Sequence, residues 1–109
     1  YRLKALAKAM RKVIRFKPEM LDKVLSGSKT STVRLNGVEY GRDLILTDGR
    51  RVVAATLVEQ SRMKVSEALR YFRDEGFQSQ EEFLRYLKRI YRDVGLQDQV
   101  TIVRFSLTR

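Results

Sequence analysis

The sequence predicts a mixed α/β (α+β) domain, built as a small β-barrel with peripheral helices. Three observations favour this class. Segments rich in β-branched residues occur near both ends of the chain, two segments with helical spacing lie together in its second half, and glycines separate the elements. The chain has 109 residues, of which 43% are apolar, so it fits a single domain with one core.

The first third of the domain predicts a strand followed by a helix. Residues 13–16 are apolar apart from one arginine and favour a short strand. Pro18 suits the first turn of a helix, where its missing N–H costs nothing. Gly27 suits the left-handed residue that ends a helix. We therefore expect a helix over residues 18–26.

The middle of the chain predicts several strands joined by turns. Asn36-Gly37 is a strong turn signal. Residues 44–46 predict a short buried strand, and the β-rich segment 52–58 could extend toward Met63. A last strand is expected over residues 100–107.

Two helices are expected between these strands. The apolar spacing from Val65 to Phe72 is helical, and Gly76 ends that segment. Ser79 and Glu82 have the spacing of a capping box, in which each side chain satisfies the other's free backbone donor. The helix behind them is closed by Gly95.

Charge is concentrated in the N-terminal third. Residues 1–34 hold ten Lys and Arg against two acids, whereas residues 35–109 hold thirteen against eleven. Residues 1–12 predict a basic N-terminal extension, either a short amphipathic helix or a frayed tail, and residues 13–109 predict the domain itself. A net charge of +10 favours a polyanionic partner such as RNA or a nucleotide. The alternative is a solvated surface rich in ion pairs.

Composition excludes several functions. The chain has no Cys and no His, which excludes disulfides, thiolate nucleophiles, the common zinc sites and Ser-His-Asp catalysis. Nothing implies a metal or an organic cofactor. No apolar run approaches the ~20 residues of a membrane span, and no secretory signal is visible. We expect no membrane partner and a cytoplasmic location.

Residues 27–34 read Gly-Ser-Lys-Thr-Ser-Thr-Val-Arg and hold a single apolar side chain. One glycine, two cations and four hydroxyls cannot fill a core, and they have the chemistry of a site for an anion or a polar base. Lys29 and Thr32 would point to opposite faces of a regular strand. They can converge only if residues 28–31 are irregular.

The spacing Gly27-x-Lys29-x-x-Thr32-x-Arg34 resembles the motif of the ASCH family, part of the PUA-like superfamily of small β-barrels. Further landmarks match in order over residues 13–108: Gly41-Arg42-Asp43-Leu44, Glu75-Gly76-Phe77, Ile90-Tyr91 and Val103-Arg104-Phe105. The resemblance implies a PUA-like fold with a cleft beside the motif, and RNA or a modified base as its ligand.

One branch of that family consists of amidohydrolases that remove an acyl group from acetylated cytidine. The resemblance places their catalytic trio on Lys29, Thr32 and Glu75. In this hypothesis a desolvated Lys29 with a lowered pKa accepts the Thr32 hydroxyl proton, and Glu75 protonates the leaving amine. Backbone N–H groups around Gly27 and Ser28 would hold the oxyanion.

The leading hypothesis is binding without chemistry, in which the cations hold phosphate and the hydroxyls donate to a base. Two further hypotheses are a purely structural ion pair at Glu75 and a protein-interaction module. Aromatic side chains matter because bases stack on them, and Tyr40 is the best stacking candidate, although it could equally pack over the barrel mouth. The expected binding residues are Gly27, Ser28, Lys29, Thr30, Thr32, Arg34, Tyr40, Arg15 and Lys17.

Overall fold

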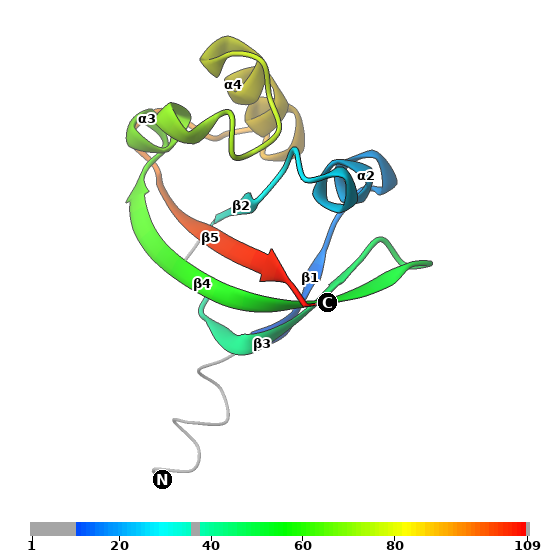
Figure 1. The fold of residues 1–109 in the computed structure, drawn as a ribbon. Coiled ribbons are helices and arrows are strands. Elements are labelled where there is room, and N and C mark those ends of the chain that lie inside the picture. The colour runs from blue at the N-terminus through cyan, green and yellow to red at the C-terminus, as the bar shows by residue number, and fades with distance from the viewer. Residues whose placement is uncertain (1–10, 36–37, 109) are drawn as a thin grey trace, which may run out of the picture.

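A five-stranded sheet with the strand order β1-β3-β4-β5-β2 forms the centre of the molecule. The computed structural model describes residues 11–35 and 38–108, and three helical segments lie on the concave side of the sheet (Figure 1). In chain order the elements are β1 (Arg11–Arg15), α2 (Pro18–Ser26), β2 (Ser31–Leu35), β3 (Tyr40–Thr47), β4 (Val52–Lys64), α3 (Val65–Ala68) with the 3₁₀ turn η1 (Leu69–Tyr71), α4 (Gln80–Ile90) and β5 (Gln99–Leu107).

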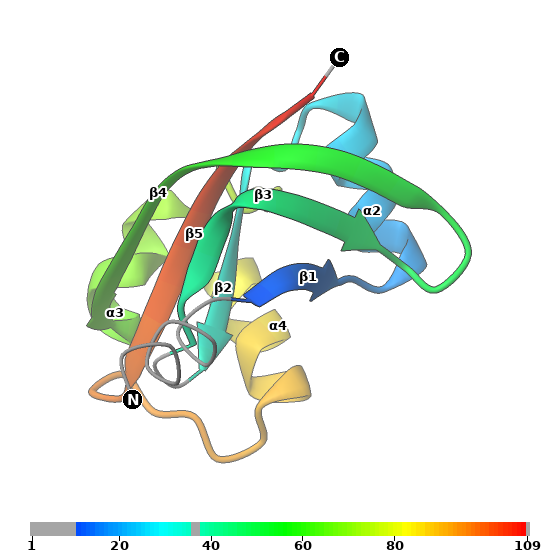
Figure 2. The same cartoon turned by 90° about the horizontal axis from the view of Figure 1, so that it is seen from below.

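The sheet curls into a partly closed barrel. All neighbouring strands are antiparallel except β1 and β3, which are parallel. A register shift between Leu57 and Glu59 accompanies the bend of the long strand β4, which wraps around the other strands in Figure 2. The two edge strands face each other, and the Arg34 side chain of β2 bridges them by donating from Nη2 to the Arg15 carbonyl of β1 at 2.7 Å.

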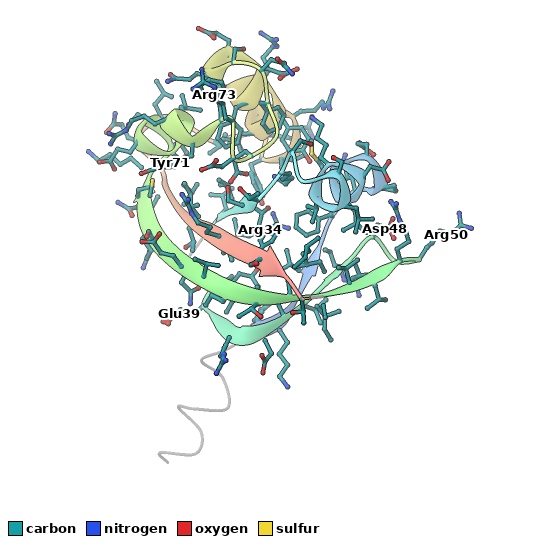
Figure 3. The ribbon with its side chains drawn as sticks, in the orientation of Figure 1. Arg34, Glu39, Asp48, Arg50, Tyr71 and Arg73 are labelled. Carbon is teal, nitrogen blue, oxygen red and sulfur yellow. The ribbon has the colours of Figure 1, made fainter. Side chains whose placement is uncertain are left out.

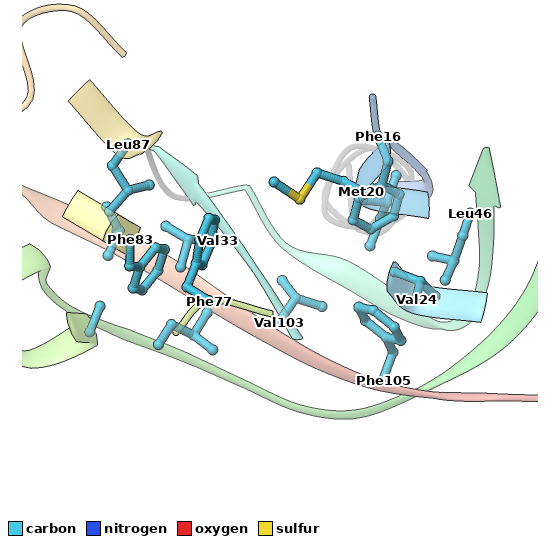
Figure 4. Packing of buried hydrophobic residues seen from close by; sticks show 14 of the residues in the cluster. Phe16, Met20, Val24, Val33, Leu46, Phe77, Phe83, Leu87, Val103 and Phe105 are labelled. Carbon is cyan, nitrogen blue, oxygen red and sulfur yellow. The ribbon is translucent and has the colours of Figure 1, made fainter. Parts of the chain in front are cut away.

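Buried apolar side chains form two groups that meet at β5. Figure 4 shows Phe16, Met20, Val24 and Leu46 near Phe105, toward the end of this strand. Farther along the same face of the strand, Phe77 stacks on Phe83, with ring centroids 5.1 Å apart. This second group attaches α4 to the sheet and so fixes the wall of the site described below.

Both predicted ends of α2 and the predicted N-cap of α4 are confirmed. Pro18 begins α2, and Gly27 ends it with a φ of +88°, a conformation that favours glycine. Ser79 caps α4 by accepting a hydrogen bond from the Glu82 amide at 3.1 Å. The Glu82 carboxylate accepts from the amide of Gln78 at 2.7 Å, one residue before the position that a capping box predicts.

Three boundaries differ from the sequence predictions. Strand β1 begins at Arg11, so the boundary expected between residues 12 and 13 falls inside this strand. Strand β3 runs from Tyr40 to Thr47, longer than the three residues expected, because its register with β4 extends to both sides of them. Helix α4 stops at Ile90, four residues before the expected end.

Most of the expected N-terminal extension and the Asn36-Gly37 turn lie outside the described residues. Within residues 11–35 and 38–108, no helix is long and apolar enough to cross a membrane.

Candidate functional site

A cavity of about 250 Å³ lies between the start of α2, strand β2 and helix α4. Three polar side chains of the motif line it, namely Lys29, Thr32 and Arg34. Glu75 joins them from the loop before α4, and Arg15 and Lys17 line it from the chain around the end of β1. The remaining wall is apolar and aromatic, and includes Phe16, Phe77, Phe83, Tyr86 and Tyr91.

Backbone hydrogen bonds hold the motif against the loop that carries Glu75. After Gly27 the chain turns, and the amides of Ser28 and Lys29 both donate to the Lys23 carbonyl. The next two amides, of Thr30 and Ser31, donate to the Asp74 carbonyl at 2.7 and 3.2 Å. Residues 28–30 are therefore irregular, as convergence of Lys29 and Thr32 requires, and β2 begins only at Ser31.

Lys29 and Glu75 form a buried ion pair at the floor of the cavity. The Lys29 Nζ donates to Glu75 Oε1 and to the Glu75 backbone carbonyl, both at 3.1 Å. The two residues are 4% and 1% exposed. Burial lowers the pKa of Lys29 from its ordinary value, the charge of Glu75 opposes that shift, and the positive charges of Arg34 and Lys23 add to it.

Ser31 also binds the Glu75 carboxylate, although the motif Gly27-x-Lys29-x-x-Thr32-x-Arg34 does not include it. It is fully buried, and its hydroxyl donates to Glu75 Oε2. The two carboxylate oxygens of Glu75 therefore have different partners, Ser31 on one side and Lys29 on the other. The signal in the sequence was the run of four hydroxyls, but spacing alone could not tell which of them reaches a carboxylate.

Arg34 and Thr32 stand beside the pair. The Arg34 Nη1 donates to Thr32 Oγ1 at 2.7 Å and to the Val33 carbonyl at 2.9 Å. With its bond to the Arg15 carbonyl, the guanidinium lies in the seam between the two sheet edges, inside the curl of the sheet in Figure 3. It also lies over the Phe16 ring, 5.4 Å from the centroid. These contacts fix Arg34 in place and orient the Thr32 hydroxyl.

The other predicted site residues lie elsewhere. Gly27 and Thr30 line a separate hollow of about 210 Å³ beside the end of β5, which Lys29 also borders. The amides of Gly27 and Ser28 donate to carbonyls of α2, so they are not free to hold an oxyanion. Tyr40 is 6% exposed and packs in the core. It does not line the cavity, and β3 lies two places from β5 and three places from β2 in the sheet.

Two aromatic residues of the α4 wall complete the cavity. Tyr86 is half-buried, and burial raises the pKa of its phenol. Its ring contacts Phe77, with centroids 5.3 Å apart. Tyr91 is partly buried, packs against the core cluster and borders the cavity.

Comparison with solved structures places this architecture among known folds. The chain matches a variant of the ASCH protein from Zymomonas mobilis with a TM-score of 0.63 and 19% identity, over 94% of this chain and 70% of that one. The chain has an ASCH-like fold. It also matches the ASCH domain from Lactobacillus crispatus JV V101, with a TM-score of 0.65 and 11% identity over 98% of this chain and 85% of that one.

A third match is the hypothetical protein PH0355, with a TM-score of 0.69 and 14% identity over 91% of this chain and all of that one. No protein-family model matches the chain, and neither does any curated protein sequence. These neighbours show an ASCH-like fold for the chain, with the barrel only partly closed.

Proposed function

We propose that this ASCH-like module binds a single nucleobase or nucleoside unit of RNA in the Lys29–Glu75 cavity. The observation that carries the proposal is the buried ion pair at the cavity floor. A buried pair of this kind gains little for stability, because desolvation offsets most of the attraction between the charges. Its place in a concave pocket with aromatic walls is typical of a ligand site.

Unused hydrogen-bonding capacity at the floor defines the ligand. An ammonium group has three donors, and the Lys29 ammonium makes two protein hydrogen bonds. Thr32 Oγ1 accepts from Arg34 and keeps its own proton to donate. The Glu75 carboxylate retains acceptor positions beyond its bonds to Ser31 and Lys29. The edge of a nucleobase that carries a carbonyl together with an N–H or amino group matches these three groups.

Electrostatics at the cavity entrance support a phosphate-bearing ligand. Arg15 and Lys17 are exposed and border the cavity. The chain as a whole carries a net charge of +10, which favours association with RNA and makes it weaken with added salt.

Calorimetric titration with the four ribonucleoside 5′-monophosphates tests the proposal. Cytidine, uridine and guanosine monophosphates offer the carbonyl edge and should bind more tightly than adenosine monophosphate. The double substitution Lys29→Met/Glu75→Gln, which removes both charges, should weaken binding at least about ten-fold. Arg50→Gln, at an exposed turn, is the matched control. Equal affinity in the wild-type protein and the double variant would place the site elsewhere.

A second candidate function is hydrolysis of an acylated nucleoside. The observation that favours it is that Lys29 has a lowered pKa and lines the same cavity as Thr32 and Glu75. A neutral Lys29 would take the hydroxyl proton as Thr32 Oγ1 attacks the acyl carbonyl. The C–N bond then breaks, the proton held by Lys29 passes through the Glu75 carboxylate to the leaving amine, and water hydrolyses the threonine ester, which restores the Thr32 hydroxyl.

Incubation with N4-acetylcytidine separates the two functions. Release of cytidine by the wild-type protein but not by Thr32→Val would establish hydrolysis. Binding of N4-acetylcytidine without release would leave recognition as the function of the cavity.

A further inference from the structure

A second hollow of about 500 Å³ adjoins the cavity, and Tyr91 borders both. Its walls come from four segments: the end of β2, the C-terminal end of β4, the chain after α4 and the start of β5. The hollow is separate from the Lys29–Glu75 floor, since none of the floor residues lines it. Tyr91 is therefore the residue that the small cavity and the larger hollow have in common.

Backbone hydrogen bonds hold the main chain around Tyr91. Tyr91 follows the last residue of α4, and its amide donates to the Leu87 carbonyl at 2.8 Å. Its carbonyl accepts from the amide of Val94 at 2.9 Å. Val94 is 7% exposed and belongs to the core cluster. The turn that carries Tyr91 is thus anchored at both ends.

The second hollow is lined by two arginines and two aspartates, so its formal charges balance. Arg62 of β4 and Arg92 are both exposed. Within residues 11–35 and 38–108, neither guanidinium has a carboxylate within ion-pair distance. Asp98 accepts from the Gly95 amide at 2.7 Å, and Asp93 and Gln99 line the same walls. This combination of free guanidinium groups, polar acceptors and an adjoining aromatic ring is the chemistry that binds single-stranded nucleic acid.

We propose that the second hollow is a subsite for the nucleotide that neighbours the bound base, with Tyr91 between the two bases and Arg62 and Arg92 on the connecting phosphate. The inference rests on the function proposed above and extends it, because it makes the ligand an RNA segment of at least two nucleotides rather than a free nucleoside. Successive bases stack on such aromatic rings without sequence preference, so this subsite adds affinity whichever base occupies it.

The test compares ligands that differ by one nucleotide. The tightest of the four 5′-monophosphates is titrated beside two 5′-phosphorylated dinucleotides that add uridine on its 3′ side or its 5′ side. In the wild-type protein we expect one of the two dinucleotides to bind about ten-fold more tightly than the monophosphate. Arg62→Gln/Arg92→Gln should remove that gain and leave the affinity for the monophosphate unchanged, because neither arginine lines the first cavity.

Arg85→Gln/Lys88→Gln is the matched control. These cations lie on α4 outside both hollows, and removing them lowers the net charge by the same two units. The dinucleotide gain should persist in this variant. A plot of log affinity against log salt should lose about one unit of slope in Arg62→Gln/Arg92→Gln for the dinucleotide.

Four results would overturn the subsite. If the monophosphate binds and neither dinucleotide binds more tightly, the subsite is wrong and the base-binding cavity stands. If the control variant loses the gain equally, general charge and not this hollow is responsible. If an oligoglutamate peptide binds in the hollow and no dinucleotide does, the partner is an acidic protein segment. If neither mono- nor dinucleotides bind, both the cavity and the subsite proposals are wrong.

Discussion

Two regions of this protein join a cation to a carboxylate in different surroundings. Lys29 and Glu75 meet at 3.1 Å with side chains 5% and 2% exposed. At the loop between β3 and β4, Arg51 contacts Asp48 at 2.8 Å and Asp22 at 2.6 Å; the side chains of Arg51 and Asp22 are 42% and 65% exposed, and that of Asp48 is 3% exposed. Figure 3 shows Asp48 and Arg50 at the tip of this loop, far from the cavity.

The pKa values of the two clusters shift for different reasons. Backbone and side-chain hydrogen bonds from Arg50 and Arg51 lower the pKa of Asp48 to about 2, so the folded state favours its charged form. Burial lowers the pKa of Lys29, so the folded state disfavours its charged form despite Glu75. The exposed cluster of Arg51, Asp22 and Asp48 therefore stabilises a turn, whereas the Lys29–Glu75 pair only partly offsets the cost of burying the Lys29 charge.

The largest expected effect comes from removing one partner of the buried pair. Lys29→Met leaves Glu75 buried without its countercharge, and we expect the free energy of unfolding to fall by about 3–5 kcal/mol. Lys29→Met/Glu75→Gln removes both charges and should recover most of that loss. Urea unfolding of the two variants and the wild-type protein measures the difference. A double variant no more stable than the single one would show that the pair is a stabilising structural element.

A glycine in each region gives the next comparison. Gly76 has a φ of +91°, and an added Cβ would lie 3.1 Å from Lys23 Cδ and 3.4 Å from Lys29 Cβ. Gly49, in the β3–β4 loop, has a φ of +98° and no atom within 4 Å of that position. Both alanine substitutions incur the left-handed backbone penalty of about 1–2 kcal/mol, but only Gly76→Ala also disturbs the Lys23 and Lys29 side chains.

Gly76→Ala should therefore lower the melting temperature more than Gly49→Ala and should also weaken ligand binding. Gly49→Ala should leave binding unchanged. The same shift in melting temperature for both variants would mean that the Lys23 side chain moves away from the added methyl group without loss of stability. It would also mean that the loop carrying Glu75 is not tightly held.

The two regions also differ in how far the sequence predicted them. Local signals located Gly27 at the end of α2, because helix ends and glycine conformations depend on near neighbours, but they left open whether residues 28–31 are irregular. The position of Arg34 in the seam was not predictable, and two alternatives stayed open for Tyr40, because both depend on which strands become neighbours when the sheet curls. The resemblance to the ASCH family indicated Glu75, but the contact of Ser31 with Glu75 could be found only from the coordinates. Adjacent hydroxyls on a strand face opposite sides, and the sequence does not say which side faces Glu75.

Stability should depend on pH with opposite signs in the two regions. The pKa of Asp48 is lowered from 3.8 to about 2, so its stabilising contribution is present above pH 3.8 and is lost as the pH falls toward 2. The pKa of Lys29 is lowered from 10.5, so the unfolded chain binds the proton more tightly. The contribution of Lys29 to the free energy of unfolding is therefore least favourable at low pH and becomes more favourable as the pH rises toward 10.5.

Chemical unfolding across pH, with one reference variant for each region, measures both slopes. The stability difference between the wild-type protein and Asp48→Asn should shrink below pH 3.8, and the difference between the wild-type protein and Lys29→Met should grow as the pH approaches 10.5. A flat difference for Lys29→Met would mean that Glu75 fully compensates the burial of the ammonium group.

The smallest effect is expected at Asp22. Its carboxylate is 65% exposed and only receives a hydrogen bond from Arg51 Nη1; exposed pairs of this kind contribute little. Asp48 instead accepts from the amides of Arg50 and Arg51 at 2.9 and 2.8 Å and orders the turn itself. Asp22→Ala should thus lower the melting temperature less than Asp48→Ala, and neither should alter nucleotide affinity. A larger loss from Asp22→Ala would mean that its link between α2 and the β3–β4 loop, rather than the turn, holds the exposed cluster together.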